Sequence, residues 1–360
     1  MKDQRTPKAR VLIVTHHDAK NGGRGGGDVA KVKQVRELLS GSCEVRVFGF
    51  RYFSDSGKLV WVLLAPYWIL TLASEVLRTR WDSVYCFNQR YIVIYVWFLR
   101  LLTLRRYRIF YDVLLTWQLR SSGIYRKFRW RVEYSAIKCA DTLVANSEWA
   151  REILSQGRET LLLPATVNVS VFQEQEEKRH EIRARYFTTD KDRIVGIIGP
   201  FDSEYNRPLL TFLAANIERF DDRIKFMVMG KFNERDEVRH ENVIHTGYVD
   251  DYIAHLSALD AVLVVRNTPT DGPINRIVEA MAMELPVFAN PIAARTIDHV
   301  TWGENIFVFE ESEIARKTNE LIFNDELLRE AGRKARSIAK NHYAFEKFKS
   351  VICEALAESS

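Results

Sequence analysis

Two acidic residues, Asp271 and Glu279, stand with seven residues between them in the segment TPTDGPINRIVEAMAMELPVFAN, which covers residues 268–290. Pro273 favours the first turn of a helix, so we expect Asp271 in the loop before that helix and Glu279 about two turns inside it. A ligand lying across this helix start would meet backbone amides and two carboxylates. Ionised carboxylates only accept hydrogen bonds, which suits the hydroxyl groups of a ribose and a hexose. The alternative is that Asp271 caps the helix and Glu279 is an exposed helical residue.

A glycine-rich loop follows the first apolar run of the chain. Its sequence, THHDAKNGGRGGGDVAKVKQ, holds five glycines, of which the last three are Gly25, Gly26 and Gly27. Glycines let backbone amides approach a ligand closely, and the helical pattern that follows would direct its positive end there. The loop therefore predicts either a phosphate or sugar cradle or a flexible turn. His16 and His17, just before it, are suited to hydrogen bonds with an acceptor.

A similar loop opens the second half of the chain, where an apolar run ends at Gly199 in the sequence IIGPFDSEYNRPLLTFLAA. Arg207 stands near the start of the helix expected after it. An arginine binds two phosphate oxygens at once, and the helix start adds its own positive end. Arg207 is therefore expected either to bind a phosphate group or to be a capping or surface residue.

Short apolar runs rich in β-branched residues alternate with helical patterns, which is typical of βαβ units and a mainly parallel sheet. In the first half we expect strands beginning at Val11, Val45, Ser83, Arg108 and Thr142. In the second half we expect strands beginning at Arg193, Lys225, Val243, Ala261 and Pro286. The sequence therefore predicts an α/β protein with two Rossmann-like, doubly wound domains facing a central cleft, joined by a linker near residues 164–179. Because ligands of such sheets bind at the carboxyl ends of the strands, the loops described above are the expected site.

Length and composition indicate a globular protein of two domains. The chain has 360 residues, of which 47% are hydrophobic and 28% charged, and this excludes disorder as an overall description. Four cysteines without metal-ligand spacing predict reduced thiols, and the N-terminal residues do not fit a secretory signal, so we expect a cytoplasmic protein. The apolar segment 59–74 is shorter than a membrane-spanning helix and contains Pro66, so we expect a buried or membrane-surface helix.

Charge is distributed unevenly along the chain. Residues 1–165 hold 27 Lys and Arg against 14 Asp and Glu, whereas residues 166–360 hold 25 against 33. Basic residues of the first half are interleaved with aromatic ones, as in LRRYRIFY and IYRKFRWR. This pattern predicts either a surface that meets anionic lipid at the inner face of the cell membrane or ordinary solvated helix faces. A nucleic-acid partner is not expected, because no recognised binding module accompanies the charge.

The carboxylate segment resembles the E-x7-E motif of retaining GT-B glycosyltransferases of the group 1, or family 4, type. That motif is commonly written Glu-Gly-Phe-Pro-x4-Glu-Ala-Met-Ala-x-Gly-x-Pro-Val. This chain has Asp-Gly-Pro-Ile at 271–274, Glu-Ala-Met-Ala at 279–282 and Leu-Pro-Val at 285–287. The segments ADTLVANSEWAREIL, LLPATVNVSVF, HTGYV and LSALDAVLVV resemble further parts of the family in the expected order. The resemblance thus covers nearly the whole chain.

The resemblance implies that a nucleoside-diphosphate sugar is the substrate, and that transfer proceeds with retention and without a metal or other cofactor. By their matching positions, Arg207 would bind the diphosphate, Glu279 the ribose, and Asp271 would lie beside the transferred sugar. These three are the expected catalytic residues. The expected donor-binding residues are Gly199, Arg207, Lys231, Asp271, Gly272, Pro273, Ile274, Asn275 and Glu279. Those expected on the acceptor or phosphate side are His16, His17, Gly25, Gly26, Gly27 and Asp112.

The same resemblance assigns roles to the domains. We expect an acceptor-binding domain at residues 1–170 and a donor-binding domain at residues 171–345. Residues 346–360 would form a C-terminal helix that could pack back on the first domain. The acceptor would be a hydroxyl group of a glycan or of a lipid-linked molecule.

Several positions depart from the family pattern. Asp271 replaces the usual Glu, Pro200 replaces the basic residue expected after Gly199, and Glu284 replaces a small residue. Asp112 stands near the end of the fourth expected strand, where the family has a His. Either Lys231 or Arg276 could supply the missing positive charge for the diphosphate.

The sequence therefore predicts a glycosyltransferase of cell-envelope glycan or glycolipid assembly. The alternative is a non-catalytic relative of the same fold that binds a sugar nucleotide or a glycan. An epimerase on this fold would need acid-base groups in the cleft, for which His16, His17 and His245 are the histidine candidates.

Overall fold

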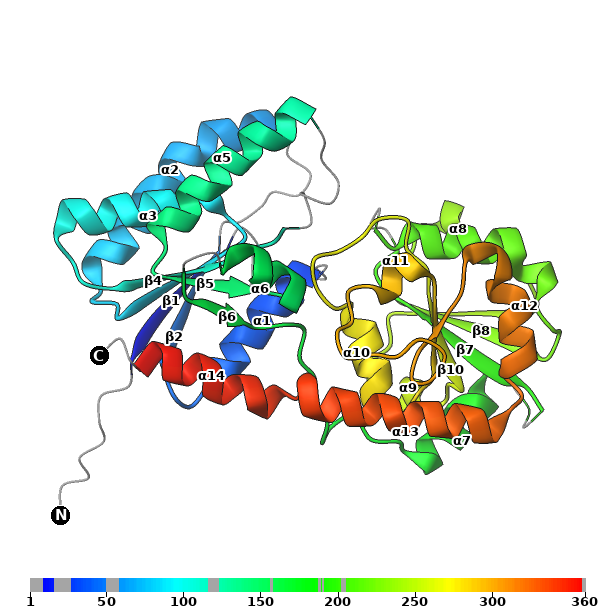
Figure 1. Ribbon diagram of the computed structural model, residues 1–360. Helices are drawn as coiled ribbons and strands as arrows, with labels where there is room; N and C mark the ends of the chain where they lie inside the picture. Colours follow the sequence, from blue (N-terminus) through cyan, green and yellow to red (C-terminus); the bar gives the residue numbers. More distant parts are fainter. Residues whose placement is uncertain are drawn as a thin grey trace, which may run out of the picture. The chain divides into compact units, whose positions relative to one another are not determined.

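The computed structural model describes residues 9–15, 27–49, 58–115, 123–155, 158–186, 189, 191–201 and 205–357. The chain divides into two units: unit 1 comprises residues 1–163 and 346–360, and unit 2 comprises residues 164–345. Each unit holds a six-stranded sheet of parallel strands with helices packed against it (Figure 1). The predicted α/β fold with two parallel sheets is confirmed.

Unit 1 has the strand order β2-β1-β3-β4-β5-β6. Figure 1 shows α2, α3 and α5 together on one face of this sheet and α1 and α14 on the other. Helix α14 is tied to the sheet where Arg108 Nη1 donates to the backbone oxygen of Ala355 at 2.9 Å. The strands are β1 (Arg10–Thr15), β2 (Glu44–Gly49), β3 (Ser83–Phe87), β4 (Arg108–Asp112), β5 (Thr142–Ala145) and β6 (Thr160–Leu162). The helices are α1 (Gly27–Leu39), α2 (Lys58–Arg78), α3 (Arg90–Thr103), α5 (Gly123–Cys139), α6 (Glu148–Leu154) and α14 (Phe345–Ala357).

Unit 2 has the strand order β12-β11-β10-β7-β8-β9, so its first strand, β7, lies between β8 and β10. The strands are β7 (Arg193–Ile198), β8 (Ile224–Met229), β9 (Val243–Gly247), β10 (Ala261–Val264), β11 (Val287–Ala289) and β12 (Phe307–Val308). The α-helices are α7 (Glu176–Arg185), α8 (Arg207–Asn216), α9 (Tyr252–Ser257), α10 (Asn275–Ala282), α11 (Pro291–Ala294), α12 (Glu311–Leu321) and α13 (Asp325–His342). Two short 3₁₀ helices are η1 (Ile217–Arg219) and η2 (Glu234–Asp236).

The strands of unit 2 are apolar on both faces, because helices cover both faces of the sheet. In β7, Val195 and Ile197 join the core under α8 and α12, whereas Ile194 and Ile198 join the core under α10 and the second half of α13. This two-sided burial explains why the strands read as continuous apolar runs rather than as an alternation of apolar and polar residues.

The ten predicted strands are all present, and each begins within one residue of its predicted start. Two further strands, β6 with three residues and β12 with two, were not predicted. The apolar segment 59–74 lies within α2, a helix of 21 residues that continues through Pro66. Within the described ranges, no helix combines the length and the apolar character needed to cross a membrane.

One buried carboxylate joins the starts of the two central strands of unit 2. The Oδ1 atom of Asp260 accepts a hydrogen bond from Arg179 at 2.6 Å, and its Oδ2 atom accepts one from Arg183 at 3.1 Å. The same Oδ2 atom accepts from the backbone amide of Ile194 in β7 at 2.7 Å. Asp260 directly precedes β10, and its side chain is only 8% exposed. It therefore holds α7, β7 and β10 together at one end of the sheet.

The departure at Glu284 has a visible backbone consequence. Glu284 follows α10 with φ of +60°, a left-handed conformation in which glycine carries no steric cost. This conformation gives a physical reason for the glycine at this position of the family motif. Its backbone oxygen also lies so close to α13 that a β-carbon built on Gly332 would come within 2.0 Å of it. The turn after α10 is thus packed tightly against α13.

We expect Asp260→Ala to lower the free energy of unfolding of unit 2 by about 3–5 kcal/mol, because it leaves the buried guanidinium of Arg183 without its anionic partner. Chemical denaturation followed by circular dichroism would measure this change. The control is Asp325→Ala, which removes the partner of Arg193 at 2.6 Å but lies half exposed. The ion pair between Arg193 and Asp325 should contribute less than about 1 kcal/mol to the free energy of unfolding. Equal effects of the two substitutions would contradict the anchoring role of Asp260.

Candidate functional site

The strand order of unit 2 places a switch point between β7 and β10. Strands β8 and β9 lie on one side of β7, and β11 and β12 lie on the far side of β10. In open parallel sheets the connections diverge at such a point, which leaves a crevice at the carboxyl ends of the two strands. Gly199 follows β7 there, Arg266 follows β10, and α10 begins after the loop that leaves β10.

Two arginines meet on one side chain at this point. Asn206 Oδ1 accepts a hydrogen bond from Arg276 Nη2 at 2.6 Å and another from Arg266 Nη1 at 2.8 Å. Asn206 Nδ2 in turn donates to the backbone oxygen of Pro200 at 3.0 Å. Arg276 Nη1 also donates to the backbone oxygen of Ile198, the last residue of β7. Arg276 thus connects α10 to the end of β7.

Two glycines allow the close approach that this arrangement requires. Gly199 has φ of +152°, and a β-carbon built on it would lie 2.6 Å from Arg276 Nη1. Gly230, which follows β8, has φ of +129°, and its β-carbon would lie 2.1 Å from the backbone oxygen of Gly199. Real β-carbons do not make contacts this short, so a side chain at either position would displace its neighbours. Glycine at position 199 therefore has a steric reason, and its predicted donor-binding role stays a prediction.

Glu279 lies in the same region and interacts with a residue that was not predicted. Tyr252, the first residue of α9, donates its hydroxyl group to Glu279 Oε2 at 2.7 Å. Desolvation raises the pKa of Glu279, and this rise is opposed by the Tyr252 hydrogen bond and by the positive charge of Arg276. Burial lowers the pKa of Arg276. The interpretation of Glu279 as an exposed helical residue is therefore wrong, since its side chain is half-buried and paired.

Helix α10 begins later than predicted. Ile274 is its N-cap residue and Asn275 its first residue, so Pro273 precedes the helix instead of occupying its first turn. Glu279 is consequently the fifth helical residue, just over one turn inside. Asp271, which is 4% exposed, and Gly272 lie in the loop before the helix. The N-cap side chain is apolar and makes no capping hydrogen bond, which rules out the interpretation of Asp271 as the N-cap of α10.

The structure places two predicted cations elsewhere at this end of the sheet. Arg207 begins α8, and its Nε atom lies 3.5 Å from Asp236 Oδ2 in η2. It lines a groove of about 460 Å³ between α8 and residues 235–238. Lys231 is exposed and follows Gly230. The guanidinium group in contact with Gly199 is that of Arg276, so a diphosphate role for Arg207 stays a prediction.

The predicted acceptor-side residues belong to unit 1. The carboxylate of Asp112 is fully buried at the end of β4 and accepts hydrogen bonds from Tyr85 Oη at 2.6 Å and Asn146 Nδ2 at 3.4 Å. Burial raises the pKa of Tyr85, and the negative charge of the Asp112 carboxylate raises it further. Gly27 is the first residue of α1. His16, His17, Gly25 and Gly26 lie outside the described residues.

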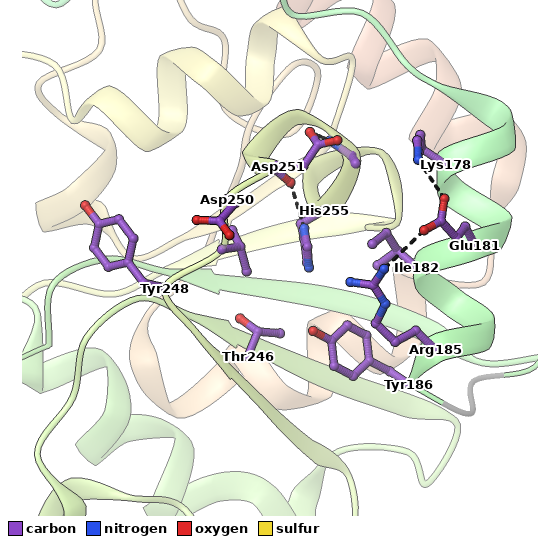
Figure 2. Close-up of a pocket in the computed structure, with 12 residues that line it drawn as sticks. Lys178, Glu181, Ile182, Arg185, Tyr186, Thr246, Tyr248, Asp250, Asp251 and His255 are labelled. Carbon is purple, nitrogen blue, oxygen red and sulfur yellow. Dashed lines mark hydrogen bonds and ion pairs between the residues drawn. The ribbon is translucent and has the colours of Figure 1, made fainter.

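A separate pocket of about 340 Å³ lies on unit 2 between α7 and the loop from β9 to α9 (Figure 2). Glu181 forms ion pairs with Lys178 at 2.7 Å and Arg185 at 3.1 Å on its α7 side. His255, on the other side, forms a hydrogen bond through Nδ1 with the backbone oxygen of Asp251 at 2.7 Å. Of the predicted site residues that lie in the described ranges, none lines this pocket. Among the residues that the structure describes, no group of three His, Cys, Asp or Glu side chains could hold a metal ion.

The contact between Gly199 and Arg276 yields a double-mutant prediction. Gly199→Ala should lower the free energy of unfolding by about 1–3 kcal/mol, because the new methyl group displaces Arg276. In a protein that already carries Arg276→Ala, Gly199→Ala should lower the free energy of unfolding by at least about 1 kcal/mol less, because the atoms that obstruct the methyl group are gone. The matched control is Gly303→Ala, where φ is +87° but nothing lies within 4 Å of the β-carbon. Additive effects in the thermodynamic cycle would refute the contact.

The sequence of unit 2 matches a known family. Residues 192–324 match the family model described as glycosyl transferases group 1. This range contains Gly199, Asn206, Arg276 and Glu279, and therefore the whole group of interactions at the switch point. No curated protein matches the chain in sequence.

Solved structures resemble the chain over almost its full length. HepE from Anabaena, in complex with UDP-glucose, has a TM-score of 0.70 at 16% identity, and the match covers 97% of this chain and 99% of that one. Sucrose-phosphate synthase from Thermosynechococcus elongatus has a TM-score of 0.75 at 14% identity, and the match covers 98% of this chain and 99% of the synthase chain. WaaG, a glycosyltransferase involved in lipopolysaccharide biosynthesis, has a TM-score of 0.64 at 14% identity, and the match covers 95% of this chain and 99% of the WaaG chain. The chain thus has the GT-B glycosyltransferase fold, and its segment 192–324 matches a group 1 glycosyltransferase domain.

Proposed function

We propose that this protein is a glycosyltransferase that moves a sugar from a nucleoside-diphosphate donor to a hydroxyl group of a glycan or lipid-linked acceptor. The transfer would retain the configuration of the sugar and would need no metal. It would take place in the cytoplasm, at the inner face of the cell membrane, in the assembly of a cell-envelope glycan or glycolipid.

The observation that carries this proposal is the position of Arg276 at the switch point of a unit that matches the group 1 family. Its guanidinium group lies against the backbone of Gly199 and donates a hydrogen bond to the backbone oxygen of Ile198, at the carboxyl end of β7. The start of α10 lies in the same region and adds the positive end of a helix. A diphosphate bound there would be stabilised electrostatically as it departs, which is the main catalytic task when a sugar leaves a nucleotide.

The two carboxylates supply complementary contacts. Glu279 Oε2 already accepts one hydrogen bond from Tyr252, and its half-buried carboxylate has further lone pairs for a ribose diol. Asp271 lies in the loop before α10, where it would accept hydrogen bonds from hydroxyl groups of the transferred sugar. A contact from the donor to each carboxylate would fix the position of the nucleotide relative to the sugar.

Other parts of the proposal rest on the resemblance and on relatives of the same fold. The likeness of residues 271–287 to the E-x7-E motif supports retention and metal independence. HepE was solved with UDP-glucose, which supports a nucleotide-sugar donor. WaaG is involved in lipopolysaccharide biosynthesis, which supports a cell-envelope acceptor. Membrane location is supported by the excess of basic residues in residues 1–165.

A second candidate is a non-catalytic relative that binds the sugar nucleotide without transfer. Two positions favour it. Asp271 is one methylene shorter than the usual Glu, and Pro200 contributes only a backbone oxygen, bonded to Asn206, where the family has a basic side chain. Activity therefore has to be measured separately from nucleotide binding.

Calorimetric titration with UDP, GDP, dTDP, ADP and their common sugar conjugates tests the donor site. We expect one nucleotide to bind clearly, and Glu279→Ala to weaken that binding about 10- to 100-fold, because it removes a charged acceptor of hydrogen bonds. Asp271→Asn should leave nucleotide binding unchanged and abolish sugar transfer. Unaltered transfer by both variants would contradict the assignment of the two carboxylates.

The same titration decides between the two arginines. If Arg276 binds the diphosphate, Arg276→Lys should weaken binding at least about tenfold, because lysine cannot form two parallel hydrogen bonds to phosphate oxygens. Arg207→Lys is the matched control, since this arginine points to Asp236. The opposite order of effects would return the diphosphate role to Arg207. Binding without transfer in the unaltered protein would favour the non-catalytic relative.

The raised pKa of Glu279 gives the binding a pH dependence. Only the ionised carboxylate accepts hydrogen bonds at both oxygens, so nucleotide affinity should fall as the pH drops through the raised pKa. The Tyr252 hydrogen bond lowers this pKa, so Tyr252→Phe should raise it further and shift the loss of affinity to higher pH. Titrations between pH 4.5 and 8 would measure both midpoints. A midpoint that moves to lower pH in Tyr252→Phe would be inconsistent with this pairing.

A further inference from the structure

Exposed apolar side chains of unit 1 are concentrated on three helices. Twelve of the sixteen large apolar or aromatic residues that are exposed in the described part of the chain lie between residues 67 and 134. Leu70 is 69% exposed, Leu102 64% and Phe128 62%. The others are Tyr67, Ile69, Leu77, Tyr91, Phe98, Leu101, Leu104, Ile124 and Tyr134. Scattered exposed apolar residues are normal, but a concentration of this kind marks an interaction surface.

The three helices, α2, α3 and α5, form one layer over the sheet (Figure 1). Tyr95 in α3 donates its hydroxyl group to the backbone oxygen of Ile69 in α2 at 2.8 Å. Each helix buries a different side from the one it exposes. Buried residues of this layer, all in the core of unit 1, are Leu72 and Val76 in α2, Val93, Val96 and Leu99 in α3, and Ala136 and Ile137 in α5.

With the exception of Ile69, the exposed apolar residues of each helix follow helical spacing, so they gather on the outer side of the layer. In α2, Tyr67, Leu70 and Leu77 are separated by three and seven residues, which places them on one side of a helix. In α3, Tyr91, Phe98 and Leu102 are separated by seven and four residues, which again gives one side. We call the exposed side of these helices, together with Ile124, Phe128 and Tyr134 of α5, the outer face of the layer.

The charge of this region is almost entirely positive. Residues 58–139 hold 14 Lys and Arg against 4 Asp and Glu. None of the four acids is exposed: Asp112 and Glu133 are buried, and Glu75 and Asp82 are half-buried. By contrast, among the basic side chains of this region that the structure describes, six are exposed, namely Arg78, Arg80, Arg106, Lys127, Arg131 and Lys138. The last three lie on α5 beside its exposed apolar residues.

We propose that the outer face of the α2, α3 and α5 layer is a docking surface for an anionic lipid bilayer. The apolar and aromatic side chains would enter the region between head groups and acyl chains, and the basic side chains would bind the lipid phosphates. This inference deepens the membrane location in the proposed function by naming the surface responsible. It does not depend on the donor site, which lies entirely in unit 2.

The chemistry of the face favours a bilayer over a protein partner. Leucine, phenylalanine and tyrosine stand beside lysine and arginine, and no exposed carboxylate interrupts them. Aromatic residues with basic neighbours are suited to the interface of a membrane, where an apolar layer lies directly below a layer of negative charge. A protein partner would need a matching acidic and apolar surface, whereas an anionic bilayer presents both properties everywhere.

Flotation of the full chain with lipid vesicles tests the proposal. We expect binding to vesicles of 70% phosphatidylcholine and 30% phosphatidylglycerol at 50 mM NaCl, with weaker binding at 500 mM NaCl because salt screens the charges. The triple variant Lys127→Glu, Arg131→Glu, Lys138→Glu should lower vesicle affinity at least about tenfold. The triple variant Leu70→Gln, Phe98→Gln, Phe128→Gln should lose the fraction of binding that resists salt.

Matched controls separate the face from net charge and from folding. Arg329→Glu, Arg333→Glu, Lys340→Glu makes the same charge change at three exposed residues of α13 in unit 2 and should leave vesicle binding within about twofold of the unaltered protein. Trp302→Gln removes an exposed aromatic residue of unit 2 and should have no effect. All variants should keep the circular dichroism spectrum and nucleotide affinity of the unaltered protein. If the protein bound vesicles but no nucleotide, the proposed donor site would be contradicted and the proposed lipid-binding face would not.

Hydrogen–deuterium exchange locates the contact directly. On anionic vesicles, peptides covering residues 66–78, 90–103 and 123–139 should gain protection, and peptides from residues 325–342 should not. Three results would overturn the proposal: no vesicle binding at 50 mM NaCl, equal loss of binding in the α13 control, or protection confined to other helices. Self-association that disappears in the apolar triple variant, without any vesicle binding, would identify the face as a protein interface instead.

Discussion

The guanidinium group of Arg276 is the element on which the candidate site of unit 2 depends. A desolvated cation is unfavourable unless acceptors surround it, and here the backbone oxygen of Ile198 and the side chain of Asn206 meet that need. These contacts fix three separate segments relative to one another: the end of β7, the start of α8 and the first turn of α10. The group that would attract an anion is thus also the group that assembles the place where the anion would bind.

The central strands of unit 2 are held at both ends by buried charge. At their starts, Asp260 brings two arginines of α7 and the amide of Ile194 together. At their carboxyl ends, Arg276 and Arg266 share Asn206. Between these ends the strands are held by apolar packing on both faces. A site built on such a frame needs little reorganisation when a ligand arrives, which is what electrostatic stabilisation of a leaving group requires.

Much of this architecture could be predicted from the sequence, because parallel strands covered on both faces leave a strong signal. Runs such as RIVGII and KFMVM are apolar at nearly every position and are separated by helical patterns. The strand β12 was missed because its two residues carry too little pattern, whereas β6 and β11 both have three residues and only β11 was predicted. The proline at 273 suggested a helix start two residues too early, since proline is also compatible with the extended loop before an N-cap.

The candidate site was less predictable, because its contacts join residues far apart in sequence. The segment from Asp271 to Glu279 could be identified from its motif, and Arg276 within it from its charge. No local pattern indicates that Tyr252 bonds to Glu279, 27 residues later, or that Asn206 accepts from Arg276, 70 residues later. The sequence predicts Arg207 on the diphosphate and leaves Lys231 and Arg276 as further sources of positive charge, and only the fold reveals that Arg276 contacts Gly199.

The short contact between Gly199 and Arg276 predicts that the two positions covary in evolution. The nitrogen of Arg276 occupies space that a β-carbon at position 199 would need. A lineage that acquires a side chain at 199 must move or lose the arginine, and one that loses the arginine no longer requires the glycine for this reason. The two positions should therefore change together among descendants of a common ancestor, although they lie 77 positions apart in the sequence. Such a pair would show, from sequences alone, which relatives keep an arginine of α10 against the end of β7.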